Sequence, residues 1–86
     1  MRAIIKSAMA IDELANTLQQ IARDDSKSVN DYTDAEIVHE AKYVLSCFNE
    51  AGHLNNEDYI GENGEEQYKW AVGQVRQLNA FIKKFA

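Results

Sequence analysis

The sequence predicts a small all-α protein, a three-helix bundle or helical array that forms one domain over residues 1–86. Apolar residues recur at alternating three- and four-residue steps in three segments, as they do on one face of a helix. Proline is absent, only four glycines occur, and strand-like alternation of useful length is missing. We expect helices over about residues 7–24, 34–51 and 64–85, with an acidic loop between the second and the third.

The first predicted helix has a clear apolar stripe but no sharp ends. It is expected to start near Ser7, and residues 1–6 either extend it by a turn or form a short extended lead. The stripe comprises Ile11, Leu14, Leu18 and Ile21. The connector DDSKSVND follows it.

The middle helix has a well-marked start and stop. Thr33 at the N-cap and Glu36 three residues later form a capping box, and Tyr32 and Ile37 are placed as a hydrophobic staple. Gly52 can adopt the left-handed conformation that ends a helix. The apolar stripe between these ends comprises Ile37, Ala41, Val44, Phe48 and Ala51.

The C-terminal helix is the longest of the three. Glu65 and Glu66 lie in its first turn and Lys83 and Lys84 in its last, which is the placement that the helix dipole favours. Asn63 is a possible cap. Its apolar stripe comprises Tyr68, Ala71, Val75, Leu78, Ile82 and Phe85.

The net charge of −5 is unevenly distributed. Residues 1–23 carry +1, residues 24–66 carry −10 and residues 67–86 carry +4, which together make −5. Either the acidic middle and the basic end attract each other within the fold, or an acidic face binds a basic partner. A basic stripe of Lys69, Arg76 and Lys83 either follows phosphates or pairs with acids of a neighbouring helix. Since the rest of the chain would repel a polyanion, we expect no direct binding of nucleic acid.

The stretch NNEDYIGENGEE, residues 55–66, resembles a calcium loop in composition only. In an EF-hand register that starts at Asn56, Ile60 stands at position 5, where an oxygen ligand is required, and Gln67 stands at position 12, where a bidentate glutamate is required. We therefore expect no metal here. The stretch is instead a candidate acidic surface for a protein partner, comprising Glu57, Asp58, Glu62, Glu65 and Glu66.

Other arrangements of metal-binding residues also fail on spacing. The pairs Glu36/His39 and Glu50/His53 lie fourteen residues apart on one predicted helix, about 21 Å along its axis. They cannot share an ion within one chain, which leaves only a site across a homodimer. We expect no metal and no cofactor.

Catalytic residues are equally hard to assemble. Cys47 lies beside Val44 and Phe48, so a partly buried and inert thiol is expected. His39 is eight residues away, about 12 Å along the helix axis, which is too far to deprotonate it. Phosphate-binding glycine loops and hydrolase motifs are missing from the sequence. We expect no catalytic residues and no enzyme.

The expected compartment is the cytoplasm. One cysteine cannot form an internal disulfide, which favours a reducing environment. The segment MRAIIKSAMAI is too short and too polar for a signal peptide, and no apolar run approaches a membrane span. We therefore expect no contact with a membrane.

Trp70 and Phe81 lie off the main apolar stripe of the C-terminal helix, eleven residues apart and nearly in line. Such residues either contact a third helix or form an exposed aromatic patch that anchors another chain.

These features predict a non-enzymatic protein that acts by binding another protein. Small size, acidity and missing catalytic motifs suit small phage-type antagonists, which mimic nucleic acid and block a host defence or nucleic-acid-processing complex. The alternative is a homodimeric helical regulator or scaffold without charge mimicry. Binding to a basic partner should weaken steeply as salt rises, whereas a dimer held by Trp70 and Phe81 should survive high salt.

Overall fold

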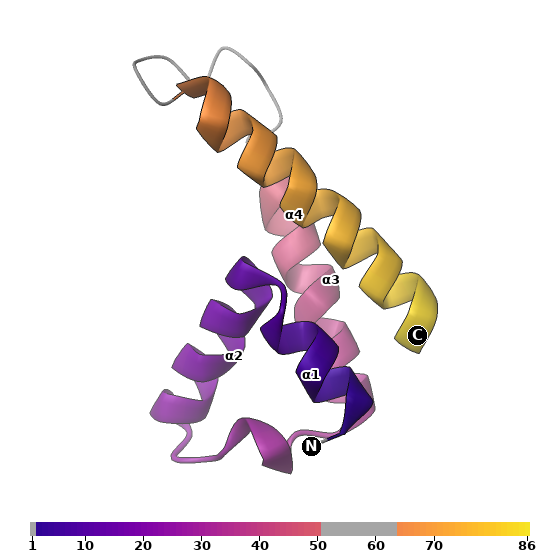
Figure 1. Cartoon of the computed structure of the whole chain (residues 1–86). Helices are drawn as coiled ribbons and strands as arrows, with labels where there is room; N and C mark the ends of the chain where they lie inside the picture. The colour runs from indigo at the N-terminus through magenta and orange to yellow at the C-terminus, as the bar shows by residue number, and fades with distance from the viewer. Residues whose placement is uncertain (1, 51–63) are drawn as a thin grey trace.

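The central helix of the fold is α3, on which the other helices pack. The structure is a computed structural model that describes residues 2–50 and 64–86. Within these ranges the elements are α1 (Ala3–Met9), α2 (Asp12–Asp24), the short 3₁₀ helix η1 (Val29–Asp31), α3 (Asp34–Glu50) and α4 (Gly64–Phe85). Helix α3 contacts α1, α2 and α4, and α1 contacts both α2 and α4 (Figure 1). The all-α prediction is confirmed, and the described residues contain no strand.

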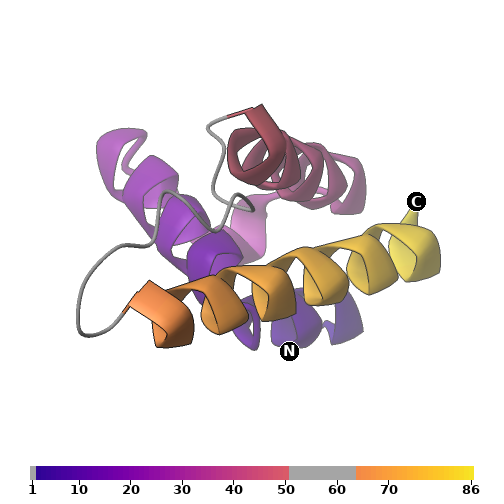
Figure 2. The ribbon, with the colours of Figure 1, turned by 90° about the horizontal axis from the view of Figure 1, so that it is seen from above.

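The helices are arranged as an open array around α3. Figure 1 shows α4 as the longest helix, running past α3 so that its first turns extend beyond the others. Figure 2 shows α4 running across α1, with α2 and α3 in this view on the opposite side of α4 from α1. The N-terminal end of α2 lies nearest to α4, and its C-terminal end points away. Helix α2 therefore has one flank along α3 that no other described helix covers.

The single helix predicted over residues 7–24 is wrong, because the chain breaks at Ala10 and Ile11. Ile11 has extended backbone angles (φ −105°, ψ 109°) and is the N-cap of α2. It is also buried, together with Ile4 and Ile5 of α1 and Leu14 of α2. The break directs the apolar side chains of both helices into one core. Residues 1–6 were left open by the sequence, and residues 3–6 are helical.

The C-terminal end of α2 is closed without glycine. Ser26 adopts a left-handed conformation with φ 56°. The backbone N–H of Lys27 donates to the carbonyl of Ala22 at 2.9 Å, and that of Ser26 donates to the carbonyl of Arg23 at 3.4 Å. These two bonds form a Schellman motif, which satisfies carbonyls at the helix end.

The predicted start of α3 is confirmed in detail. The backbone N–H of Glu36 donates to Thr33 Oγ1 at 3.1 Å, and the backbone N–H of Thr33 donates to Glu36 Oε1 at 3.0 Å. Tyr32 and Ile37, the predicted staple, are both buried. The guanidinium of Arg2 donates to the carbonyl of Tyr32 and pairs with Asp34, so the start of the chain is fastened to the start of α3.

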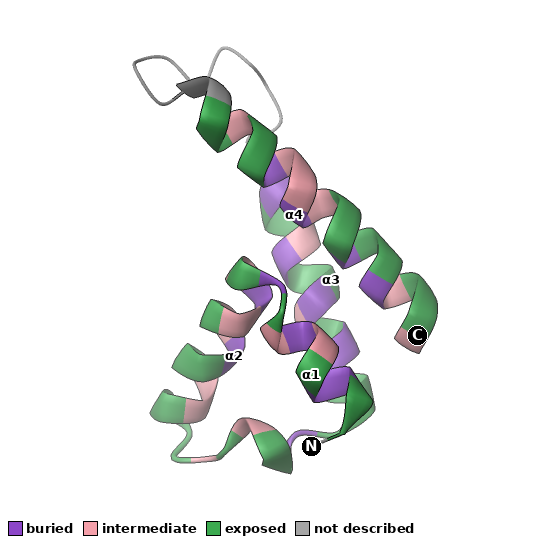
Figure 3. Cartoon of the chain, in the orientation of Figure 1, coloured by how far each residue is buried: buried purple, intermediate pink, exposed green. Residues whose placement is uncertain are grey.

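The core lies between α3 and the helices that surround it (Figure 3). Helix α4 matches its predicted bounds and contributes three buried apolar side chains to this core. The predicted stop at Gly52 and the predicted cap at Asn63 lie outside the described residues. The described helices do not combine the length and apolar character that crossing a membrane requires. The buried apolar residues are Ile4, Ile5, Ala8, Ile11, Leu14, Leu18, Tyr32, Ile37, Val38, Ala41, Val44, Phe48, Ala71, Leu78 and Phe81.

Candidate functional site

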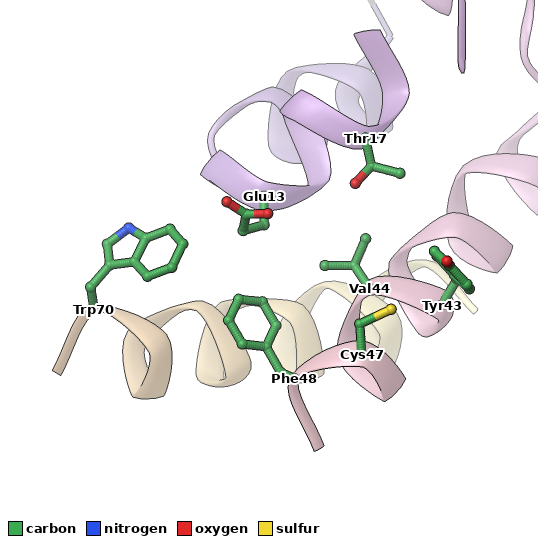
Figure 4. A pocket seen from close by; sticks show the side chains of 7 residues that line it. All are labelled: Glu13, Thr17, Tyr43, Val44, Cys47, Phe48 and Trp70. Atoms are coloured by element: carbon green, nitrogen blue, oxygen red, sulfur yellow. The ribbon is translucent and has the colours of Figure 1, made fainter. Parts of the chain in front are cut away.

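The most distinctive surface feature is a hollow where α2, α3 and α4 meet. It has a volume of about 270 Å³. Figure 4 shows side chains from all three helices directed toward it, with Trp70 of α4 on one side and the α3 side chains on the other. Its lining residues are Glu13, Thr17, Tyr43, Val44, Cys47, Phe48 and Trp70.

This hollow is one end of a longer groove between α2 and α3. A second hollow shares Thr17 and Tyr43 with the first, and a third shares Ile21, His39 and Glu40 with the second. The three are continuous along the uncovered flank of α2, and we name them together the α2–α3 groove. Its lining includes Glu13, Thr17, Gln20, Ile21, Asp24 and Asp25 from α2 and its C-cap, and Glu36, His39, Glu40, Tyr43 and Cys47 from α3.

One end of the groove is aromatic. The rings of Phe48 and Trp70 are in tilted contact, with their centroids 6.0 Å apart at an interplanar angle of 59°. Trp70 is nevertheless 42% exposed and Tyr43 is 59% exposed. Large apolar side chains that remain this accessible at the edge of a hollow are typical of binding surfaces.

The position of Trp70 is set by polar contacts between α4 and the start of α2. Trp70 Nε1 donates to Asp12 Oδ2 at 3.3 Å. One turn further along α4, the buried Gln74 accepts a hydrogen bond at Oε1 from the backbone N–H of Glu13 at 3.1 Å. The side chain of the N-cap residue Ile11 accepts no hydrogen bond from the first turn of α2. Gln74 therefore satisfies the backbone N–H of Glu13, which an N-cap side chain would usually bind.

The other end of the groove is acidic. Asp24, Asp25, Glu36 and Glu40 line it together with Lys27. Lys27 Nζ lies 3.4 Å from Glu36 Oε2. The backbone N–H of Thr33 lowers the pKa of Glu36, with the Thr33 hydroxyl and Lys27 acting in the same direction. Carboxylates therefore outnumber cationic side chains at this end of the groove.

Tyr32 forms part of the floor at the acidic end. Lys27 Nζ lies over its ring, 4.5 Å from the centroid. Its hydroxyl is buried and has no hydrogen-bond partner among the described residues. Burial raises the pKa of Tyr32, and the charge of Asp25 raises it further. The Tyr32 hydroxyl therefore stays protonated.

Cys47 differs from the sequence expectation of a partly buried thiol, because it is exposed. It lies on the flank of α3 that faces the groove, next to the buried stripe rather than within it. A hydrogen bond with the Cys47 thiol raises the pKa of Tyr43, and the charges of Cys47 and Glu40 contribute. The thiol of Cys47 and the hydroxyl of Tyr43 therefore add polar atoms to the α3 wall of the hollow, opposite Glu13 and Thr17 of α2.

The predicted acidic surface at residues 57–66 is only partly within the described chain. Glu57, Asp58 and Glu62 lie outside the described residues. Glu65 belongs to the first turn of α4, and Glu66 is exposed on the same helix. A partner-binding role for these residues stays a prediction.

Trp70 and Phe81 are separated by the fold. Phe81 is 4% exposed and stacks at a tilt on Phe85, with centroids 4.9 Å apart. Of the two interpretations, packing within the chain is therefore correct for Phe81, and this residue is not part of an exposed aromatic patch. Trp70 lines the α2–α3 groove instead, with Phe48 beside it.

The remaining candidates do not converge on a second site. The basic stripe of Lys69, Arg76 and Lys83 is exposed on α4. Among the described residues, His, Cys, Asp and Glu side chains do not gather in groups of three or more that could hold a metal ion. His39 is exposed on the wall of the acidic end of the groove.

Comparison with protein-family models, curated proteins and solved structures finds no match to this chain. The function is therefore inferred from the geometry and charge of the groove.

Sequence reasoning missed Glu13, Thr17 and Tyr43 as groove residues. Tyr43 carried a usable indication, since a tyrosine on the polar flank of α3 has no place in that helix's own apolar stripe. Glu13 and Thr17 carried none, because they become groove residues only when the chain bends at Ala10 and Ile11.

Proposed function

We propose that this protein binds a basic protein partner through its acidic surface and acts as an inhibitor that mimics nucleic acid. The observation that supports this most strongly is the grouping of carboxylates along one groove. Glu13, Asp24, Asp25, Glu36 and Glu40 all line it, against the single cationic side chain of Lys27. The groove lining therefore has a formal charge of −4, counted as five acids and one lysine.

The charge extends beyond the groove. Residues 24–40 contain six acids, with Asp31 and Asp34 added to the four at the acidic end, and Lys27 as the only base. These residues belong to the end of α2, η1 and the first half of α3, which meet at one end of the molecule (Figure 1). Exposed carboxylates spaced along a surface resemble a row of phosphates and steer a basic protein toward it.

The test begins with the partner that the protein captures at low salt from cells of its source organism. That partner is bound to a fluorescently labelled oligonucleotide, and the protein is titrated in. We expect the oligonucleotide to be displaced, and the displacement to weaken as sodium chloride rises. A captured partner that never binds nucleic acid, or that binds this protein and the oligonucleotide together, would overturn the proposal.

Two variants with equal net charge separate placement of charge from total charge. Asp24→Asn, Asp25→Asn and Glu40→Gln together raise the net charge from −5 to −2. Gln19→Lys, Asn79→Lys and Ala80→Lys together do the same at exposed positions that do not line the groove. We expect only the first variant to lose displacement of the oligonucleotide. Equal loss in both variants would mean that net charge alone governs binding.

The homodimer alternative is tested by sedimentation. Of the two aromatic residues proposed to hold the dimer, Phe81 is buried in the core and Trp70 is exposed. A dimer that persists at high salt and dissociates on Trp70→Ala would favour the regulator or scaffold hypothesis over charge mimicry.

A further inference from the structure

We infer that the α2–α3 groove binds an amphipathic basic helix of the partner, about three turns long, with a large apolar side chain seated at the aromatic end. This inference rests on the proposed function, because it specifies which element of the basic partner enters the groove. It adds a specific fit to what would otherwise be attraction between opposite charges.

The two walls of the groove have the same helical spacing. On α2 the lining residues Glu13, Thr17, Gln20 and Asp24 fall at i, i+4, i+7 and i+11. On α3 the lining residues Glu36, Glu40, Tyr43 and Cys47 repeat that spacing. Each wall is therefore one flank of a helix, and eleven residues at 1.5 Å per residue make it about 16 Å long. A groove between two helices, with that length and those walls, matches an amphipathic helix of about three turns.

The chemistry of the walls decides what kind of helix fits. At the aromatic end, the exposed ring of Trp70 presents carbon atoms that an apolar side chain would cover, beside Phe48 and Val44, which line the hollow although they are nearly buried. At the acidic end, Asp24, Asp25 and Glu40 would face the occupant. An occupant that matches both ends has a large apolar side chain near one terminus and Lys or Arg side chains along the following two turns.

A second copy of this chain fits less well. Its basic helix is α4, whose apolar face is already packed in the core through Ala71, Leu78 and Phe81. It could therefore offer positive charge to the groove but no buried apolar anchor. Its other helices carry too few basic residues to match the acidic end.

The test uses a synthetic peptide of fourteen residues as the probe. Its leucines lie at i, i+3 and i+4 near one terminus, lysines continue the same helical face over the following two turns, the other positions are Ala, and it lacks cysteine and tryptophan. The chain contains one cysteine and one tryptophan, and both line the aromatic end of the groove. Alkylation of Cys47 by iodoacetamide and the fluorescence of Trp70 therefore both report occupancy.

We expect the peptide to protect Cys47. At a peptide concentration ten times its Kd, about one-tenth of the protein is free, so the alkylation rate should fall about tenfold. The emission of Trp70 should shift to shorter wavelength as the peptide covers it. In the matched variant Cys47→Ser with Asn79→Cys, the thiol moves to an exposed position of α4 that does not line the groove, and its alkylation should not change.

A second peptide of the same composition, with the leucines scrambled out of helical register, separates fit from charge. Equal protection by both peptides would overturn the inference. A peptide that does not protect Cys47 would also overturn the inference. If the triple variant Asp24→Asn, Asp25→Asn and Glu40→Gln nevertheless loses partner binding, the proposed function would survive that result. Conversely, protection by the helical peptide alone, together with a partner that never releases nucleic acid, would contradict the proposed function. The inference that the groove binds a basic helix would stand. If the alkylation rate of Cys47 falls as the protein concentration rises, with no peptide present, the occupant is a second copy of this chain. That result also overturns the inference.

Discussion

Gln74 shows how one buried polar side chain fixes the relation between two helices. It is 5% exposed and serves a backbone donor at the start of α2 from a position on α4, 61 residues away in the chain. Its amide nitrogen donates in turn to Gln77 Oε1 at 3.4 Å. Because the contact is directional, it sets the register of α4 against α2 and with it the position of Trp70 at the end of the groove.

Removing this contact should be costly. In Gln74→Ala, the N–H of Glu13 loses its partner in a part-buried position, which we expect to lower the free energy of unfolding by about 1–3 kcal/mol. The matched change Gln67→Ala, at an exposed site of the same helix, should stay within about 0.5 kcal/mol. Urea unfolding followed by circular dichroism measures both. A loss as small as that of the control would show that water replaces the amide.

The capping box at α3 makes stability depend on pH. Hydrogen bonds from Thr33 hold the pKa of Glu36 below its ordinary value, so the folded chain binds this proton less readily than the unfolded chain does. The stabilisation is therefore fully present at neutral pH and is lost as pH falls below the ordinary glutamate pKa of about 4.3.

The measurement compares the parent protein with Glu36→Gln, which can still reach the backbone of Thr33 but does not titrate. The stability of the parent should exceed that of the variant at pH 7, and the two should converge as the pH falls toward 3. Thr33→Ala should cost about 0.5–2 kcal/mol because it removes the other half of the box. A stability difference between parent and Glu36→Gln that does not change with pH would contradict this account.

At the residue scale, the sequence predicts only what is encoded locally. The bonds between Thr33 and Glu36 follow from two residues three positions apart, and they are present as expected. The bond between Gln74 and Glu13 could not be predicted, since nothing near Gln74 indicates that a polar residue would be buried against a helix start.

At the scale of elements, the break between α1 and α2 is the main departure from expectation. Neither glycine nor proline marks it, and the apolar stripe continues through it. The acidic pair Asp12 and Glu13 was the available indication, because carboxylates favour the first turn of a helix. Tertiary packing selects the bend, since it brings the side chains of both helices against α3.

The packing of α1 can be tested directly. Ile5 is 1% exposed, so Ile5→Ala should cost about 2–5 kcal/mol if this short helix is an integral part of the core. The control is Lys6→Ala, an exposed neighbour on the same helix. Thermal and urea unfolding should show one cooperative transition in both variants. A cost for Ile5→Ala close to that of the control would mean that α1 separates from the core before the rest unfolds.

Helices α3 and α4 were predictable because each has a regular apolar stripe, and because the start of α3 and the last turn of α4 carry local indications. The position of their off-stripe aromatic residues was not. Trp70 and Phe81 lie on similar flanks of α4, yet one lines an exposed groove and the other is buried. The difference arises because different parts of the chain pack against α4 at different positions along its length. A helical wheel does not show those neighbours.

At the scale of the whole molecule, the charge distribution opposes folding. Residues 24–66 carry −10, and the described part of this segment gathers six acids near one end. The ion pairs Arg2–Asp34 and Lys27–Glu36 offset part of that repulsion. They are exposed, and pairs of this kind contribute little each.

Salt should therefore stabilise the protein. Raising sodium chloride from about 0.01 M to 0.15 M shortens the screening length from about 30 Å to about 8 Å, which weakens repulsion between the acids. We expect the urea midpoint to rise over this range, and to rise less in the variant Asp24→Asn, Asp25→Asn and Glu40→Gln. A midpoint that falls with salt would show that the two ion pairs outweigh the repulsion.

The candidate site illustrates what composition can and cannot indicate. The sequence shows that acids are concentrated in one stretch, and the candidate surface at residues 57–66 stays a prediction because most of it lies outside the described residues. The α2–α3 groove, which the sequence did not indicate, has walls from separate segments, as in Thr17 of α2 and Tyr43 of α3. A groove between two helices depends on their relative placement, which no local pattern encodes.

The bond between Gln74 and Glu13 also bears on the order in which the molecule can be completed. During synthesis the ribosome adds Gln74 sixty-one residues after Glu13. Helices α1 and α2 therefore leave the ribosome before the side chain that closes the start of α2 exists. Until α4 docks, that end of α2 is capped only by water, and the aromatic end of the groove lacks its Trp70 wall. The aromatic end of the groove is thus completed only after α4 has been made, so a nascent or truncated chain without α4 would present the acidic half of the groove without its aromatic half.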